Sequence, residues 1–371
     1  MTQNPRVAVV GAGLIGTSVA LALRERGTEV LLSDRDPATL ALAVELGAGR
    51  PLPDEPGEPA EPVDVAVLAV PPAAVGRTLL EAQKRGLARF YTDVASVKTR
   101  PVMDAVDLGC DLRSYVPGHP LAGRERSGPA AARADLFLGR PWALCPTEAT
   151  SAEAVEAVTA LVRACGAELH RVDPVEHDEA VALVSHGPHV VSAAVAARLK
   201  DAPSIALDLA GQGVRDVTRI AASDPALWLD ILSANAAPVA EVLDAVAGDL
   251  ALAAAMLRAT SSAEPDVAEV ITQKVGDLLA RGNTGRARIP GKHGGGQPQY
   301  THVQVVIPDR PGELARIFEA AGDAGVNIED VSIEHSPGLP VGVADLSVQP
   351  EAAEPLAAAL RARGWSVPVL P

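Results

Sequence analysis

The segment that decides the fold is residues 6–27, RVAVVGAGLIGTSVALALRERG. A short apolar run leads into a glycine-rich turn, and the turn opens a helical pattern. A GxGxxG turn between a strand and a helix is typical of a dinucleotide-binding βαβ unit. The first glycine permits the tight turn, the second lets backbone N–H groups approach the pyrophosphate, and the third allows close helix packing. The residues expected to bind the cofactor here are Gly11, Gly13, Leu14, Ile15 and Gly16.

Asp34 ends the next apolar run, residues 28–34. A carboxylate at this point of a dinucleotide-binding unit binds the ribose hydroxyls and repels a 2′-phosphate. The cofactor is therefore expected to be NAD rather than NADP. The neighbouring Arg35 could accept a 2′-phosphate, so tolerance of NADP stays open at this point.

Short apolar runs alternate with helical patterns through roughly the first 170 residues, which predicts a parallel α/β sheet. The clearest helices are expected at residues 16–27 and 151–166. The expected strands are residues 6–10, 28–34, 63–70, 88–96, 113–118 and 141–146. We assign residues 1–172 to this first, nucleotide-binding domain.

From residue 173 the apolar residues recur at helical spacing, which predicts an all-helical domain over residues 173–280. Its first long helix, residues 174–200, is expected to kink at Pro188. Further helices are expected within 204–232 and 237–259. Their apolar faces suggest that the helices pack on one another and on a second subunit.

Residues 281–299, RGNTGRARIPGKHGGGQPQ, cannot bury a core and are predicted to form a linker. The last block, residues 300–371, shows the order strand, helix, strand, strand, helix, strand. This βαββαβ order predicts a ferredoxin-like domain.

The composition excludes several functional classes. A net charge of −15 over 371 residues argues against non-specific nucleic-acid binding and against docking on an anionic membrane. No window of 18 uncharged apolar residues and no signal peptide is found, so no membrane segment is expected. The odd set Cys110, Cys145 and Cys165, without CxxC spacing, is typical of buried thiols in a reducing cytoplasm.

His119 lies in the Gly/Pro-framed segment VPGHPLAGRERSG, residues 116–128. The segment follows a strand end, on the side where open α/β sheets bind ligands. His119 is therefore a candidate acid or base, with an ordinary surface-loop histidine as the equal alternative. Ser96, in TDVASVK (92–98), could reach the same crevice and bond a histidine or the nicotinamide carboxamide. It could also cap the helix that follows.

His186 and His189 stand three apart on one predicted helix face. Because no further ligands of suitable spacing accompany them, we expect no metal site. Contact with the substrate is the better functional interpretation, and a pair of histidines at a helix kink is the structural one.

Arg215 and Arg219 share a predicted helix face at positions i and i+4 and could clamp a carboxylate. The alternative is a solvated face on which Asp216 pairs with an arginine. Trp228 lies further along the same stretch, where a tryptophan is more often part of a core than a ligand platform.

These motifs together resemble the prephenate/arogenate dehydrogenases, the oxidoreductases of tyrosine biosynthesis, over essentially the whole chain. The most specific of them is the run His-Pro-x-x-Gly-x-Glu-x-Ser-Gly within residues 118–128. The segments that carry the resemblance are 11–16, 92–98, 118–128, 185–189 and 215–228. The last block resembles an ACT domain, whose regulatory amino acid, tyrosine, is expected at Gly312, Leu314, Asn327 and Ile328.

The resemblance implies a role for each matching residue. His119 matches the catalytic histidine that bonds the ring hydroxyl, and Ser96 the serine that orients it and touches the nicotinamide. Arg219 matches the arginine that binds a substrate carboxylate, and His189 a second substrate contact. Further substrate-binding positions are expected at Glu125, His186, Asp216 and Trp228.

The resemblance also implies the reaction, the NAD-dependent oxidative decarboxylation of prephenate to 4-hydroxyphenylpyruvate. The alternative substrate is L-arogenate, which would give L-tyrosine, and Glu125 could pair with its ammonium group. The enzyme is expected to have a Rossmann-type NAD-binding domain and a helical domain that forms a homodimer.

Two other classes compete with this interpretation. A β-hydroxyacid dehydrogenase would place a catalytic lysine on its helical domain, yet residues 173–273 contain only Lys200. A non-catalytic, NAD-responsive regulator with an amino-acid-sensing module would not need His119, Ser96 and Arg219 together.

Overall fold

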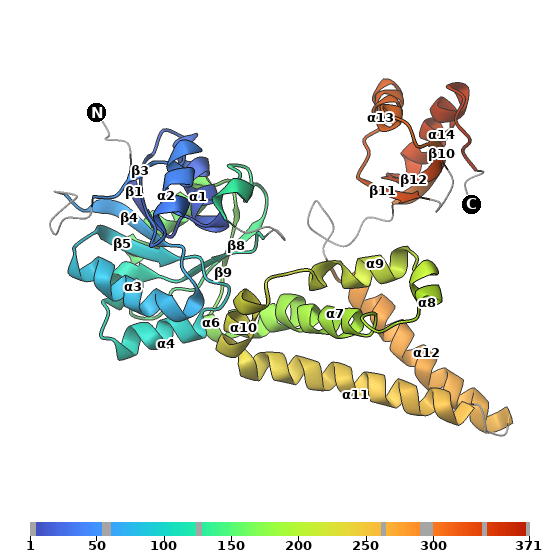
Figure 1. Ribbon diagram of the computed structural model, residues 1–371, viewed down its shortest axis with the longest axis horizontal. Helices are drawn as coiled ribbons and strands as arrows, with labels where there is room; N and C mark the ends of the chain where they lie inside the picture. Colours follow the sequence, from blue (N-terminus) through green and yellow to red (C-terminus); the bar gives the residue numbers. More distant parts are fainter. Residues whose placement is uncertain are drawn as a thin grey trace. The chain divides into compact units, whose positions relative to one another are not determined.

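The computed structural model describes residues 5–53, 61–123, 128–260, 265–289, 300–335 and 340–368. The chain divides into two compact units, Met1–Gly248 and Asp249–Pro371. The first contains the predicted nucleotide-binding part and most of the helical part. The second contains a helical hairpin arm and the C-terminal sheet (Figure 1).

A six-stranded parallel sheet forms the centre of the first unit. In spatial order its strands are β3 (Arg50–Pro51), β2 (Glu29–Ser33), β1 (Arg6–Val10), β4 (Val63–Leu68), β5 (Ala88–Asp93) and β6 (Tyr115–Val116). This is the strand order of a dinucleotide-binding Rossmann fold. The prediction of a parallel α/β sheet is confirmed, although the very short β3 was not predicted.

Helices cover both faces of this sheet because its central strands are apolar on both sides. In β1, Val7 and Val9 belong to the core on one face, while Ala8 belongs to the core on the other. The helices of the first face are α1 (Leu14–Arg24), α2 (Pro37–Glu45) and α5 (Ala152–Ala164). Those of the second face are α3 (Pro72–Lys84) and α4 (Thr99–Asp107).

A second, three-stranded sheet corrects the predicted strand set. It consists of β7 (Gly118–Pro120), β8 (Pro141–Leu144) and β9 (Glu168–Arg171), with β7 and β8 antiparallel and β8 and β9 parallel. The predicted strand 113–118 is therefore split, and 141–146 does not join the large sheet. Pro117 stands at the break, where it has no N–H to donate to a continuing ladder. Short 3₁₀ turns flank these strands at Leu112–Ser114 and Pro129–Ala131.

The predicted long helix 174–200 is interrupted. It consists of α6 (Pro174–Val181), a π-helical turn (Ala182–His186) and α7 (Gly187–Ala197). The irregularity thus lies just before Pro188 rather than at it. Pro188 cannot donate a backbone N–H to the preceding turn, which permits that turn to widen. Gly187 follows the wide turn, where a Cβ would lie 2.6 Å from a side-chain carbon of Val242.

After α7 the chain forms four short helical elements and then two long helices. They are α8 (Ser204–Asp208), α9 (Gln212–Thr218), a 3₁₀ turn (Arg219–Ala221), α10 (Pro225–Ala234), α11 (Ala236–Thr260) and α12 (Pro265–Ala287). The predicted linker is wrong at its start, because α12 continues through Ala287. Arg281 donates to Asp249 of α11 at 2.7 Å, which ties this end of α12 to its neighbour.

The C-terminal part forms an antiparallel sheet in the order β10-β12-β11. Its elements are β10 (Thr301–Pro308), α13 (Glu313–Asp323), β11 (Asp330–His335), β12 (Val341–Val348), a 3₁₀ turn (Pro350–Ala352) and α14 (Ala353–Ala362). The predicted last strand is represented by a single bridge between Val306 and Ser366. Residues 369 and 370 of that predicted strand, 365–370, lie outside the described residues.

One helical stretch among the described residues, Pro174–Ala197, is long and apolar enough to cross a membrane by length and composition. The sequence, by contrast, predicts no membrane segment. A single helix of this kind is weak evidence for a membrane, because core helices of soluble proteins meet the same criterion. All three cysteines are free.

A buried ion pair joins the end of β5 to the start of β7. The ammonium of Lys98 pairs with Asp93, and both side chains are fully buried. Lys98 also donates to the carbonyl oxygen of Gly118, and the hydroxyl of Tyr115 donates to Asp93 at 2.6 Å. The large sheet and the small sheet are therefore connected through one satisfied pair of buried charges.

We expect Lys98→Met to lower the free energy of unfolding of the first unit by about 3–5 kcal/mol, because Asp93 is left as an unpaired buried charge. Urea unfolding is followed by Trp142 fluorescence in a Trp228→Phe, Trp365→Phe background, since Trp142 is fully buried in this unit. Arg100→Met is the matched control. Its pair with Asp104 is largely exposed on the arginine side, so a loss of only about 0–1 kcal/mol is expected. Equal losses in the two variants would contradict the role given to the buried pair.

Candidate functional site

The glycine-rich turn has the shape that a dinucleotide pyrophosphate needs. Gly11 has φ of 102°, and a Cβ there would lie 2.2 Å from the carbonyl oxygen of Ala69. A Cβ on Gly16 would lie 1.9 Å from the carbonyl oxygen of Gly11. A Cβ on Gly13, by contrast, would meet no described atom within 4 Å. A side chain at Gly11 or Gly16 would therefore clash with the backbone, whereas a side chain at Gly13 would meet no described atom.

This open position lies at the N-terminus of α1. Gly13 is the N-cap residue and has no side chain to cap the helix, and Leu14 and Ile15 form the first turn. Free N–H groups and the positive end of the helix dipole favour a phosphate here. The residues present thus fit a dinucleotide.

Asp34 is held against the same turn. Its Oδ2 accepts a hydrogen bond from the Ala12 N–H at 2.6 Å, and its Oδ1 accepts one from the Asp36 N–H at 2.9 Å. Asp34 directly follows β2, so its carboxylate stands at the carboxyl edge of the sheet, beside the glycine turn. This is the predicted position for binding the ribose hydroxyls. Arg35 is exposed next to it.

His119 lies on β7 and is partly buried. Its Nδ1 is 2.9 Å from Nε2 of His177 on α6, and the two rings make an edge contact with centroids 5.1 Å apart. Burial, followed by the electrostatic effects of His177, Lys98 and His186, holds the pKa of His119 well below 6.5. The imidazole of His119 is therefore neutral at pH 7 and can accept a proton.

The partner of His119 was not predicted. Ser96 was expected to orient this histidine, but within the described residues the hydrogen bond of its ring is made with His177. Ser96 lies partly buried in the loop between β5 and α4. The alternative prediction, that Ser96 caps α4, is wrong because the N-cap residue is Lys98.

Asp178 provides the cap of α4 from another helix. Its Oδ1 accepts from the Lys98 N–H and its Oδ2 from the Thr99 N–H, both at 2.8 Å. Nδ1 of His177 lies 2.8 Å from the same Oδ1. Burial raises the pKa of Asp178, but hydrogen bonds from His177 and these amides outweigh it, and the net pKa is below its ordinary value. The one sequence signal for this pair was a His–Asp dipeptide near the start of the predicted helix 174–200.

A second cluster brings three predicted residues together. The ring of His189 stacks on Trp228 with centroids 3.5 Å apart and an interplanar angle of 6°, and His186 meets Trp228 edge-on at 6.1 Å. Nε2 of His189 lies 3.0 Å from the Ser223 hydroxyl. Burial lowers the pKa of both histidines, that of His186 to about 4. Neutral rings can form a flat wall for an unsaturated substrate ring.

Asn235 connects the two clusters. Its side-chain amide donates to the carbonyl oxygen of Asp178 at 2.8 Å and lies 3.1 Å from Nδ1 of His186. Asn235 therefore links the backbone of Asp178 to His186, whose ring in turn meets Trp228 edge-on.

Arg219 begins the 3₁₀ turn after α9, and its side chain is exposed. The helix that was expected to carry both Arg215 and Arg219 ends at Thr218, and Arg219 is its C-cap residue and the first residue of the 3₁₀ turn. Asp216 accepts a hydrogen bond from the Gln212 amide at 2.7 Å on the exposed side of α9. Asp216 thus has a local partner on its own helix.

The other predicted residues fall elsewhere. Glu125 lies outside the described residues. Gly312 has φ of 88° and caps α13, beside the partly buried Leu314. Asn327 and Ile328 precede β11, where the Asn327 amide donates to Glu329 at 2.6 Å. Of the four residues expected to bind an amino acid, Gly312, Asn327 and Ile328 thus lie in the two loops that flank α13, and Leu314 lies in the first turn of α13.

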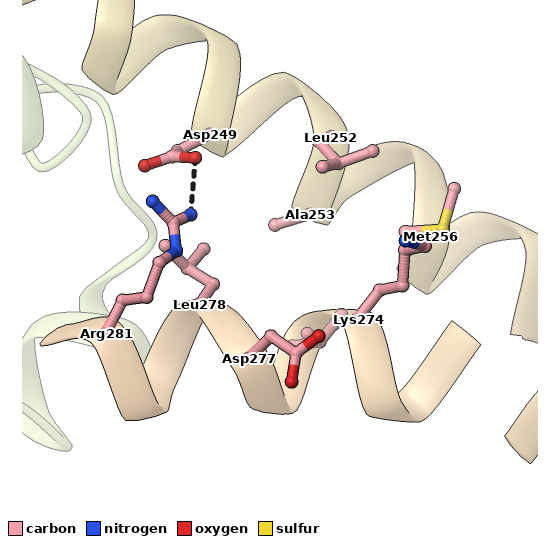
Figure 2. A pocket seen from close by; sticks show the side chains of 9 residues that line it. Asp249, Leu252, Ala253, Met256, Lys274, Asp277, Leu278 and Arg281 are labelled. Atoms are coloured by element: carbon pink, nitrogen blue, oxygen red, sulfur yellow. Dashed lines mark hydrogen bonds and ion pairs between the residues drawn. The ribbon is translucent and has the colours of Figure 1, made fainter. Parts of the chain in front are cut away.

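A small pocket of about 140 Å³ lies between α11 and α12 of the second unit (Figure 2). Leu252, Met256 and Leu278 line it, and the Asp249–Arg281 ion pair closes one end. It contains none of the predicted site residues. Among the described residues no group of three or more His, Cys, Asp or Glu side chains is placed to hold a metal ion.

Two family models match the chain. "Prephenate dehydrogenase, nucleotide-binding domain" matches residues 19–171, and "Prephenate dehydrogenase, dimerization domain" matches residues 173–273. A protein of Streptomyces niveus named "Probable prephenate dehydrogenase NovF" is 42% identical over 361 residues, which cover 96% of this chain and 98% of that protein.

Solved structures similar to the chain include two dehydrogenases. Prephenate dehydrogenase from A. aeolicus, in complex with hydroxyphenyl propionate and NAD+, is 27% identical with a TM-score of 0.64, covering 76% of this chain and 98% of that one. Synechocystis arogenate dehydrogenase is 28% identical with a TM-score of 0.59, covering 74% of this chain and 99% of that one. The Rossmann-like sheet, the dinucleotide turn and these matches agree, and the chain belongs to the prephenate dehydrogenase family of NAD-dependent oxidoreductases.

Proposed function

We propose that this protein converts prephenate to 4-hydroxyphenylpyruvate by NAD-dependent oxidative decarboxylation, in tyrosine biosynthesis. The observation that carries the proposal is His119. It is a partly buried histidine whose pKa lies well below 6.5, and it stands just past the carboxyl end of the parallel sheet. Ligands of open α/β sheets bind at this edge, next to the glycine turn.

His119 acts as the general base. The substrate is a cyclohexadienyl carboxylate with a hydroxyl on the ring carbon that gives up hydride. As His119 accepts the hydroxyl proton, the oxygen electrons form the carbonyl bond that drives hydride from this carbon. Bound NAD+ supplies the acceptor for this hydride. Loss of the ring carboxylate as CO₂ then leaves its electron pair to complete the aromatic ring, which makes the reaction effectively irreversible.

The substrate-binding residues are proposed from both clusters. Arg219 binds a substrate carboxylate as an orienting clamp, because a chain with net charge −15 needs a local cation to hold a dianion. His189 and Trp228 present stacked flat faces on which the substrate ring can pack. Ser96, at the carboxyl edge of β5, is proposed to contact the nicotinamide carboxamide. Glu125, His186 and Asp216 complete the proposed set.

L-Arogenate is the second candidate substrate, since the Synechocystis neighbour is an arogenate dehydrogenase. Arogenate shares the ring and its hydroxyl with prephenate and differs in carrying an amino acid side chain. The chemistry assigned to His119 is the same for both.

Assembly and regulation are proposed from the rest of the chain. We propose domains at 1–172, 173–280 and 300–371, which the match boundary between 171 and 173 supports. A homodimer is supported by the dimerization-domain match and by exposed leucines on α11 and α12, among them Leu250, Leu257 and Leu279. The C-terminal sheet is proposed to be an ACT-like domain that binds tyrosine. A cytoplasmic location is consistent with the three free cysteines.

We expect His119→Asn to lower kcat with prephenate about 10²–10⁴-fold, because the proton acceptor is lost. The KM for NAD+ should stay close to that of the wild type. NADH formation is measured with prephenate and with L-arogenate, and the higher kcat/KM identifies the substrate. His170→Asn, a change of an exposed histidine on β9, is the control. Full activity of His119→Asn would refute the mechanism, and a wild-type protein inactive on both substrates would refute the function.

Gly13→Ala should fold normally and bind NAD+ poorly. The added methyl meets no described atom within 4 Å but points into the space assigned to the pyrophosphate. Such an overlap costs about 1–3 kcal/mol, which corresponds to a rise of about 5- to 150-fold in the Kd for NAD+. Calorimetric titration measures the Kd, and thermal unfolding checks the fold. Gly322→Ala on α13, also without a neighbour within 4 Å, is the control. Unchanged NAD+ affinity in Gly13→Ala would place the cofactor elsewhere.

Tyrosine is expected to lower the activity of the full-length protein in a saturable way, and Asn327→Ala is expected to weaken this response. Asn327 lies in one of the two loops proposed to hold the amino acid, and its side-chain amide offers a polar contact. Activity is measured against tyrosine concentration, with Gln304→Ala on the exposed side of β10 as the control. No change in activity or stability up to saturating tyrosine would remove the regulatory proposal.

A further inference from the structure

The inference concerns the two residues behind His119, which the sequence did not single out. His119, His177 and Asp178 form a continuous chain of ring nitrogens and carboxylate. Nδ1 of His119 lies 2.9 Å from Nε2 of His177, and Nδ1 of His177 lies 2.8 Å from Oδ1 of Asp178. Both His177 and Asp178 are only 3% exposed, so water does not compete for these bonds.

The donor of the hydrogen bond between His177 and Asp178 follows from the state of Asp178. Its two oxygens already accept from the backbone N–H groups of Lys98 and Thr99 at the start of α4. Its pKa is below the ordinary value, so it is ionised at pH 7 and can only accept. Nδ1 of His177 must therefore carry the proton of the bond to Asp178.

The donor of the hydrogen bond between His119 and His177 then follows as well. A neutral His177 protonated at Nδ1 has an unprotonated Nε2, which can only accept. Nδ1 of His119 must then donate to it, and Nε2 of His119 is left without a proton. Burial, His177, Lys98 and His186 hold the pKa of His119 well below its ordinary value, so its neutral ring carries a single proton, and this proton lies on Nδ1.

We propose that Asp178 and His177 are positioning residues that hold His119 in the one tautomer whose Nε2 can take the proton of the substrate hydroxyl. The proposal deepens the proposed function and rests on it. The substrate proton moves to Nε2 of His119, and the resulting imidazolium keeps its Nδ1–H bond to His177. The carboxylate of Asp178 stabilises this cation through the intervening ring.

Two matched variants of His177 separate this role from a structural one. Gln and Met are both unbranched and of similar size, but only Gln offers an oxygen that can accept from Nδ1 of His119. We expect His177→Met to lower kcat about 100-fold, as loss of a correctly oriented base does, with the KM for substrate nearly unchanged. His177→Gln should recover at least about ten-fold of that loss. His170→Met on β9 is the control for replacing a histidine.

The tautomer itself is read from the ¹⁵N chemical shifts of the imidazole nitrogens, which distinguish protonated from unprotonated nitrogen. The signals of His119 are identified by their absence in His119→Asn. In the wild-type protein at pH 7 we expect an unprotonated Nε2 and a protonated Nδ1, and in His177→Met a mixture of both tautomers.

The outcomes separate this proposal from the proposed function. A wild-type protein inactive on prephenate and arogenate defeats the function, while the spectrum still reports the tautomer. If the wild type is active but Nε2 of His119 carries the proton, the positioning role is overturned. His177 would then donate to Nδ1 of His119 instead of accepting from it. Equal losses in His177→Met and His177→Gln, or a loss confined to KM, also overturn it.

Discussion

The contact on which the active arrangement depends is the seat of the Asp178 carboxylate on the first N–H groups of α4. These groups need an acceptor, because Lys98 at the N-cap provides no side-chain cap of its own. A carboxylate from α6 satisfies them and also favours the positive end of the α4 dipole. One charged group thereby joins the helical part of the first unit to the parallel sheet. His177 bonds to this carboxylate, and Asn235 donates to the backbone carbonyl oxygen of the same residue.

The buried ammonium near this contact is paired with a carboxylate. Lys98 is fully buried, and its ammonium is matched by Asp93, which also accepts from Tyr115. Burial lowers the pKa of His119 and His186 and so keeps these two rings neutral at pH 7. The site therefore combines compensated ions, which fix the backbone, with uncharged rings, which stay available for proton transfer.

Local patterns were enough to predict the parts of the fold that depend on neighbours in the chain. The strand–turn–helix unit of residues 6–27 has a strong signal because Gly11 and Gly16 admit no side chain. The strand β9 was missed because three of its four residues are exposed and polar, which removes the apolar signature of a sheet strand. The small sheet also escaped prediction, since Pro117 separates two strands that looked continuous.

The candidate site was predictable only where a residue carries its own chemistry. His119, His186, His189 and Trp228 were found because such side chains stand out in an Ala-rich sequence. His177 and Asp178 were missed because their meaning lies in contacts with residues about 80 positions away, and an acidic helix start hides them. The end of α9 at Thr218, between Arg215 and Arg219, has no local marker in the sequence.

The π-helical turn at Ala182–His186 also sets the angle around the helix axis between side chains of α6 and side chains of α7. Each residue of a regular α-helix advances about 100° around the axis, so the twelve positions from His177 to His189 would leave these side chains about 120° apart. A π turn takes up one additional residue, which reduces the separation to about 20°. Removing a single residue from this turn would restore a regular helix and rotate everything after it by about 100°. The turn thus acts as a one-residue insertion that directs the histidines of α6 and α7 to the same side of the chain.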